Sequence, residues 1–230
     1  MSQLVLPLRL ADHAVFASFL DRGNETLVAT LAGLAGGRRG QGCWLWGASA
    51  TGRTHLLQAV CGEAGDRSVY LPVDALADAG PGILDGLASR ELVCIDDVDR
   101  VAGDAGWEFA LFNLCNELID SGGRLVVSAG AAPREAGFRL ADLESRMSRL
   151  PVFQVRPLDE RQRAAALQLR ARHRGLELPD ETAAYLLRHS RRDMASLYEL
   201  LDELDLEALR AQRRLTIPFV RDVIARRGKA

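Results

Sequence analysis

The sequence is almost without lysine. Lys229 is its only one, so nearly all of the 29 basic residues are arginines. The bias runs through the whole chain, and a single arginine where lysine is usual has to be judged against it. The basic residues are balanced by 31 acidic ones, for a net charge of −2 and a pI near 6.1. This balance argues against bulk attraction to DNA or to an anionic membrane.

Cysteine is scarce and shows no metal-binding spacing. The four cysteines, Cys43, Cys61, Cys94 and Cys115, lie in apolar segments and none belongs to a CxxC pair. We therefore expect them to be small buried side chains in a reducing cytosol, and not zinc ligands.

Long hydrophobic runs are missing as well. No apolar run reaches the roughly 18 residues that a membrane span requires, and no basic segment precedes an apolar one at the N-terminus, as a secretory signal would require. Hydrophobic residues make up 48% and charged residues 26% of the chain, which is typical of a globular protein with its own core. We expect a cytoplasmic protein without a membrane partner.

Short apolar runs alternate with helical patterns in the first two thirds of the chain. The predicted strands are 43–46, 68–73, 92–95, 125–128 and 152–155. The predicted helices are 26–35, 54–63, 81–89, 106–120 and 140–147. Apolar strands separated by helices indicate a parallel sheet covered on both faces.

After Pro157 the pattern becomes helical, and only Leu215–Ile217 remains as an alternative strand. The predicted helices here are 159–173, 180–189, 194–211 and 217–227. The sequence thus predicts an α/β domain over residues 13–157 and an all-helical domain over 158–230. Residues 1–12 precede them as an extended leader, because Pro7 disfavours a helix.

The segment Gly47–Thr54 follows a predicted strand and precedes a helix. It fits the phosphate-loop pattern G-x-x-x-x-G-K-[ST], except that Arg53 stands in the lysine position. Gly47 and Gly52 allow successive N–H groups to curl around an anion, and the helix start faces the same place. The Thr54 hydroxyl suits a Mg²⁺ ion. A simple glycine turn is the alternative interpretation.

Two features nearby bear on catalysis. The guanidinium of Arg53 is a planar fork where lysine offers a compact charge, so binding should survive this exchange better than hydrolysis does. The apolar run Leu92–Asp97 ends in two carboxylates: Asp96 is suited to hold Mg²⁺, and Asp97 stands where an acid polarises water. The alternative is that the two acids merely begin a turn.

These motifs resemble those of the DnaA family of AAA+ proteins, and in particular its short members that inactivate the initiator. The resemblance covers nearly the whole chain. Its further marks are Gln3–Leu8, Phe16–Phe19, Leu143–Arg146 and Leu215–Val220. It implies an α/β AAA+ P-loop NTPase core with a five-stranded parallel sheet, a small all-α lid, and ADP or ATP, with Mg²⁺, as cofactor.

The resemblance also implies residue roles. Arg146 would be an arginine finger that acts in trans on the ATP held by DnaA and promotes its hydrolysis, which prevents re-initiation. A surface arginine in an arginine-rich chain is the alternative. Phe16 and Asn24 would border the adenine and Ser128 would contact the nucleotide, with core packing as the alternative for Phe16 and Phe19.

Departures from the family pattern argue against turnover. Gly130 stands where relatives have an acidic residue, and Ala195 aligns with the lid position that usually carries an arginine. Arg191 or Arg192, one turn earlier, is a substitute that we leave open. Together with Arg53, these residues favour a stably bound nucleotide, ADP, over an active ATPase.

The leader is similar to the short peptides that bind the sliding clamp, the β subunit of DNA polymerase III. Gln3 can hydrogen-bond while Leu4, Leu6 and Leu8 fill an apolar pocket, and Pro7 limits the entropy lost on docking. A frayed terminus or an edge strand is the alternative.

Other functions stay open at this stage. A Mg²⁺-dependent ATPase such as a helicase loader is the main alternative, and an adaptor that binds DnaA without the clamp is a third. Sequence-specific DNA binding is least favoured: the chain ends at Ala230, with no helix-turn-helix pattern after the lid, and Arg210, Arg213 and Arg214 read as a solvated helix face. Whether the protein forms a homo-oligomer is also open.

Overall fold

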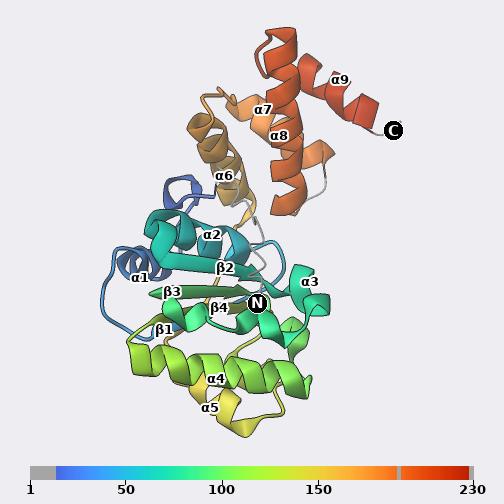
Figure 1. The fold of residues 1–230 in the computed structure, drawn as a ribbon. Helices are drawn as coiled ribbons and strands as arrows, with labels where there is room; N and C mark the ends of the chain where they lie inside the picture. The colour runs from blue at the N-terminus through green and yellow to red at the C-terminus, as the bar shows by residue number, and fades with distance from the viewer. Residues whose placement is uncertain (1–13, 191–192, 228–230) are drawn as a thin grey trace. The chain divides into compact units, whose positions relative to one another are not determined.

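The computed structural model describes residues 14–190 and 193–227, which form two compact units (Figure 1). The described part of the first unit consists of residues 14–16 and 23–156, and that of the second of residues 17–22 and 157–227 without 191–192. None of the helices in these described ranges is long and apolar enough to cross a membrane.

The first unit is built on a five-stranded parallel sheet. Its strands are β1 (Gly42–Trp46), β2 (Ser68–Pro72), β3 (Leu92–Asp96), β4 (Arg124–Ala129) and β5 (Val152–Gln154). The strand order is β2-β3-β4-β1-β5, so β1 lies between β4 and β5 and every pair is parallel. All residues of β3 and β4 are buried, which explains why their central residues are apolar. The predicted parallel sheet is confirmed.

Helices cover both faces of this sheet, as expected. Helices α1 (Glu25–Ala35) and α2 (Arg53–Ala64) pack together on one face, and α4 (Ala105–Ser121) and α5 (Ala141–Ser148) lie on the other (Figure 1). Between them lies an apolar core that includes Trp44, whose indole packs edge-on against Phe138.

Two sequence expectations between β2 and β3 are wrong. Val73 does not end a strand but begins the short helix α3 (Val73–Leu76), and residues 81–89 do not form one helix. That stretch contains two 3₁₀ turns separated by Gly86, which has φ 76°, and it follows Gly80, which has φ 80°. These positive φ values interrupt helical geometry. The 3₁₀ turns that lie wholly in the first unit are η2 (Gly65–Arg67), η3 (Ala77–Ala79), η4 (Pro81–Leu84), η5 (Leu87–Ser89), η6 (Val98–Val101) and η7 (Pro133–Glu135).

The described part of the second unit contains helices joined by loops, and no strand. Its helices are α6 (Glu160–His173), α7 (Asp180–His189), α8 (Met194–Ala211) and α9 (Ile217–Arg227). Leu215–Ile217 is not a strand: Ile217 starts α9, and the Leu215 carbonyl accepts a hydrogen bond of 3.1 Å from the Thr182 hydroxyl. The unit has its own core of leucines, which the stripe along α8 supplies in large part.

All four cysteines are buried and free, which confirms their expected role as core side chains. Burial raises the pKa of Cys43 and of Cys115 to about 12. These two thiols therefore stay neutral at physiological pH.

Candidate functional site

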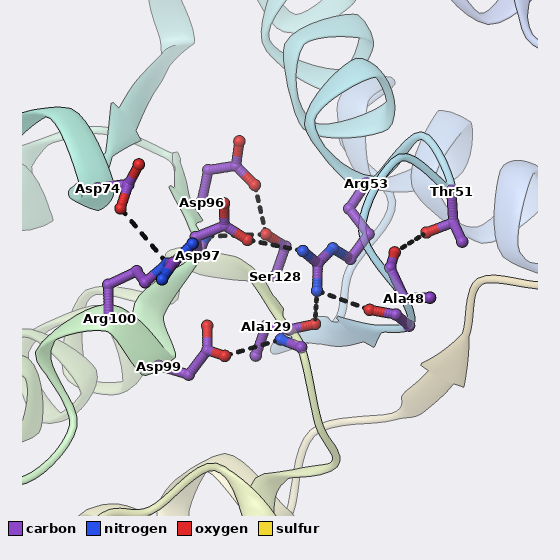
Figure 2. Close-up of polar contacts among 12 residues, drawn as sticks. Ala48, Thr51, Arg53, Asp74, Asp96, Asp97, Asp99, Arg100, Ser128 and Ala129 are labelled. Carbon is purple, nitrogen blue, oxygen red and sulfur yellow. Dashed lines mark hydrogen bonds and ion pairs between the residues drawn. The ribbon is translucent and has the colours of Figure 1, made fainter. Parts of the chain in front are cut away.

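The candidate phosphate loop and the acidic residues lie at one edge of the sheet. In a parallel sheet the carboxyl ends of all strands share an edge. The loop that starts at Gly47 leaves β1 at this edge, Asp97 follows β3, and Ala129 ends β4. Among the residues that the sequence assigned to the site, Arg53, Asp96, Asp97 and Ser128 are thereby brought together (Figure 2).

Both glycines of the loop are required by its geometry. A Cβ on Gly47 would lie 2.8 Å from the carbonyl oxygen of Val155, so the neighbouring backbone leaves no room for a side chain. Gly52 has φ 97°, in the region that favours glycine. Between them, Ala50 also has a positive φ of 61°, and the Thr51 hydroxyl closes the turn by donating to the Ala48 carbonyl over 2.9 Å.

This loop presents main-chain donors. Within the described residues, the amides of Ser49, Ala50 and Gly52 donate to no protein acceptor. Helix α2 begins directly afterwards at Arg53, so its own first N–H groups and its positive end add to the set. Donors with no acceptor at a helix N-terminus fit a phosphate group.

A magnesium ion would have to be held jointly by protein and phosphate. Thr54 lies exposed on the first turn of α2, and Asp96 lies at the end of β3. Among the residues that the structure describes, no group of three or more His, Cys, Asp or Glu side chains could hold a metal by itself. Thr54 and Asp96 fit Mg²⁺ only in the usual manner, in which phosphate oxygens and water complete the shell.

Asp96 is buried and fixed from two sides. The Ser128 hydroxyl donates to its Oδ1, and the Tyr70 hydroxyl donates to its Oδ2 over 2.8 Å. The same Ser128 oxygen accepts the Asp97 amide at 2.9 Å. Burial, and then the Asp96 carboxylate, raise the pKa of Tyr70, which keeps it a donor. As placed, Ser128 orients the two acids; its contact with a nucleotide stays a prediction.

Arg53 turns toward the sheet. Its Nη1 donates to the carbonyls of Gly47, at 2.9 Å, and Ala129, and its Nη2 donates to Asp97 Oδ1 at 2.9 Å (Figure 2). The Arg53 side chain is 13% exposed and that of Asp97 28%. Burial and the neighbouring Asp96 carboxylate raise the pKa of Asp97, although the Arg53 charge opposes the shift.

Four further residues complete the polar cluster, and sequence reasoning missed them. Asp99 Oδ2 accepts the Gly130 amide at 2.9 Å, and Arg100 pairs with Asp74 at 3.3 Å. Tyr70 reaches Asp96 because β2 pairs with β3 in parallel. The available signals were a tyrosine near the end of a neighbouring strand and the acid-rich run after Asp97.

The residues predicted to border the adenine have other contacts. The Asn24 side chain is buried and exchanges two hydrogen bonds with the backbone of Arg156, at 2.9 and 3.3 Å. These two hydrogen bonds connect the start of α1 to the segment that follows β5. Phe16 is half-buried in η1 (Phe16–Ser18). Contact of either residue with a base stays a prediction.

Arg146 lies away from the phosphate loop. It lines a pocket with Cys115, Met147 and Arg149, and the same pocket is bordered by Gln41, which directly precedes β1. This is the edge where the strands begin, so a strand length of roughly 15–20 Å separates Arg146 from the loop. Within the described residues, the guanidinium of Arg146 forms no hydrogen bond or ion pair.

The geometry of this site does not test the predicted clamp-binding and lid residues. The proposed clamp-binding residues Gln3, Leu4, Leu6, Pro7 and Leu8 lie outside the described residues, as do Arg191 and Arg192. Ala195 is the second residue of α8 and is exposed.

Comparisons with known proteins identify the fold. Residues 159–224 match the family model for the lid domain of Hda. Domain III of the replication initiation protein DnaA from Thermotoga maritima is similar with a TM-score of 0.76 at 21% identity, over 92% of this chain and 95% of that one. AMPPCP-bound DnaA from Aquifex aeolicus is similar with a TM-score of 0.67 at 21% identity, over 86% of this chain and 67% of that one. The Thermotoga maritima RuvB branch migration motor has a TM-score of 0.65 at 17% identity, over 90% of this chain and 69% of that one. The fold is that of an AAA+ P-loop protein with a helical lid.

Proposed function

We propose that this chain, which has the fold of an AAA+ protein and a lid domain that matches the Hda model, binds an adenine nucleotide and regulates chromosomal replication initiation through DnaA. In this proposal it retains ADP, docks on the sliding clamp, and stimulates hydrolysis of the ATP that DnaA carries. Its own ATPase activity is weak or absent.

The observation that carries nucleotide binding is the set of unpaired main-chain amides before α2, next to the acids at the end of β3. Backbone donors at a helix start recognise phosphate without a charged side chain. That a related fold is recorded with AMPPCP supports adenine as the base.

The position of Arg146 supports action on another molecule. It lies at the opposite sheet edge from the phosphate loop and has no acidic partner among the described residues. An unpaired guanidinium is available to stabilise charge on a phosphate of a bound partner. Because Arg146 lies a strand length away from the phosphate loop, it does not contact the nucleotide of its own chain.

Hydrolysis of DnaA-bound ATP tests this role. We expect Arg146→Ala to reduce the stimulation by about 10³-fold or more, as for other arginines supplied in trans. Arg134→Ala, which removes an exposed arginine from η7, is the matched control and should leave stimulation intact. Full stimulation by Arg146→Ala would contradict the proposal.

Clamp binding is tested separately, by retention of the chain on immobilised clamp. Replacing Gln3 and Leu4 with alanine should abolish retention and leave nucleotide binding unchanged. Undiminished retention would instead favour an adaptor that contacts DnaA alone.

The second candidate is an ordinary Mg²⁺-dependent ATPase, such as a helicase loader. It is favoured by Asp96 and Asp97, which give the site both acidic groups that hydrolysis uses. Steady ATP turnover by the isolated chain would support this candidate, whereas the regulatory proposal expects turnover close to background.

A further inference from the structure

The contacts of Arg53 suggest a role different from that of a phosphate-binding lysine. Its guanidinium bridges three separate pieces of the core: Gly47 at the loop start, Ala129 at the end of β4, and the Asp97 carboxylate after β3. The contact with Asp97 is charge-assisted and therefore stronger than a neutral hydrogen bond. The side chain is 13% exposed, so most of its surface already faces protein.

We propose that Arg53 serves as the counter-ion of Asp97 and not as a ligand of the phosphates, which are held by the main-chain amides of the loop. The proposal rests on the nucleotide binding proposed above. It makes Arg53 a positioning residue, whose effect on binding passes through the acid beside it.

The local charges explain why such a counter-ion is needed. Asp96, Asp97 and Asp99 gather beside a loop that is built to receive an anion. Of these, only Asp97 has a guanidinium partner in the described part of the chain, because Arg100 pairs with Asp74. Without Arg53, the Asp97 carboxylate would repel a bound phosphate.

Gly130 provides the space for this arrangement. A Cβ at this position would lie 3.1 Å from Asp99 Oδ2 and 3.9 Å from Arg53 Nη1. A larger side chain would therefore crowd both the Asp99 contact and the guanidinium. The absence of a side chain at Gly130 thus fits an arginine that lies against the sheet.

Four proteins distinguish a counter-ion from a ligand: the wild type, Arg53→Met, Asp97→Asn and the double variant. ADP affinity is measured by calorimetric titration in the absence of Mg²⁺, and thermal unfolding shows whether each variant is folded. We expect Arg53→Met to weaken ADP binding by about tenfold or more, because Asp97 is left unpaired beside the anion. Asp97→Asn should bind ADP more tightly than the wild type.

The double variant decides the question. If Arg53 acts through Asp97, removing both charges should restore the affinity to within about threefold of the wild type. If the double variant is as weak as Arg53→Met, or if Arg53→Met binds normally, the proposal is wrong. If Arg53→Met does not fold, Arg53→Gln replaces it in both the single and the double variant, because the glutamine amide can still donate to the carbonyls of Gly47 and Ala129. A wild type that binds no ADP would overturn the proposed function itself.

Discussion

Gly47 illustrates how a single side chain would disturb the loop. The Cβ of an alanine would overlap the Val155 carbonyl oxygen, which belongs to the backbone and cannot turn aside. We expect Gly47→Ala to lower the free energy of unfolding by about 1–3 kcal/mol, as overpacked sites do. Urea unfolding followed by circular dichroism measures this change.

The matched control is Gly62→Ala in the interior of α2. Nothing lies within 4 Å of a Cβ at Gly62, and its φ is not positive. There the exchange should raise the free energy of unfolding by about 0.5–1 kcal/mol, because alanine favours helix over glycine. Equal effects of the two substitutions would show that the loop backbone differs from the one described.

The residues of the site differ in how well the sequence predicted them. Gly47, Gly52, Asp96 and Asp97 belong to local motifs whose spacing carries the chemistry, and the structure brings them to one edge of the sheet. Tyr70 depends on the β2–β3 register, which pairs Tyr70 with Cys94 and Pro72 with Asp96. That register follows from tertiary packing, so no local pattern could have revealed it.

Asp97 and Arg53 show a second limit at this scale. Their types and positions were predicted, yet their mutual contact was not, because it requires Asp97 to adopt φ 54°. Aspartate reaches this left-handed conformation more easily than most residues, but the sequence gives no sign of it.

At the scale of elements, Glu108 links two helices. Its carboxylate is buried at the start of α4 and accepts the amides of Gly103, Arg139 and Leu140, the last two directly before α5. Burial alone would raise the pKa of Glu108, but these amides outweigh it and the pKa is lowered. Glu108 thereby positions the helix that carries Arg146.

We expect Glu108→Gln to lower the free energy of unfolding by about 1–3 kcal/mol, because its amide group would face backbone donors. Glu117→Gln, on the exposed side of the same helix, should have almost no effect. Because the pKa of Glu108 is lower in the folded than in the unfolded protein, its charge stabilises the fold at pH values above the unfolded pKa of 4.5. This stabilisation is lost as the pH falls through the pKa of the folded protein.

The pH dependence of this stability difference shows whether the charge of Glu108 or only its shape matters. The difference between wild type and Glu108→Gln should be full near neutral pH and shrink below pH 4.5, as the wild-type carboxylate takes up its proton. A difference that stays constant down to acid pH would contradict the role of the charge. Urea unfolding at several pH values provides the measurement.

Elements were predictable where one pattern dominated. The central strands β3 and β4 are buried along their whole length, and each contains an uninterrupted apolar run, Leu92–Ile95 and Leu125–Val127. The helix predicted over residues 81–89 is wrong, although the apolar residues Ile83, Leu84 and Leu87 have helical spacing. Gly80 and Gly86 have positive φ values and break this stretch into separate turns. Partial burial of separate 3₁₀ turns produces the same periodicity as one helix face.

At the scale of the whole molecule, the proposed function uses two edges of one sheet. In that proposal the loop and acids at the carboxyl edge receive a nucleotide, and Arg146 lies at the edge where the strands begin. The lid unit carries the Hda-like sequence signal over residues 159–224, whereas the similarity of the remaining chain rests on fold. The net charge of the chain, −2, argues against bulk electrostatic attraction to DNA.

Nucleotide binding by the phosphate loop is the claim on which this proposal depends. Equilibrium dialysis of the purified, nucleotide-free wild-type chain against radiolabelled ADP tests it most directly. We expect saturation at one ADP per chain, with competition by unlabelled ADP. Absence of saturable binding by the folded protein would contradict nucleotide binding by this loop.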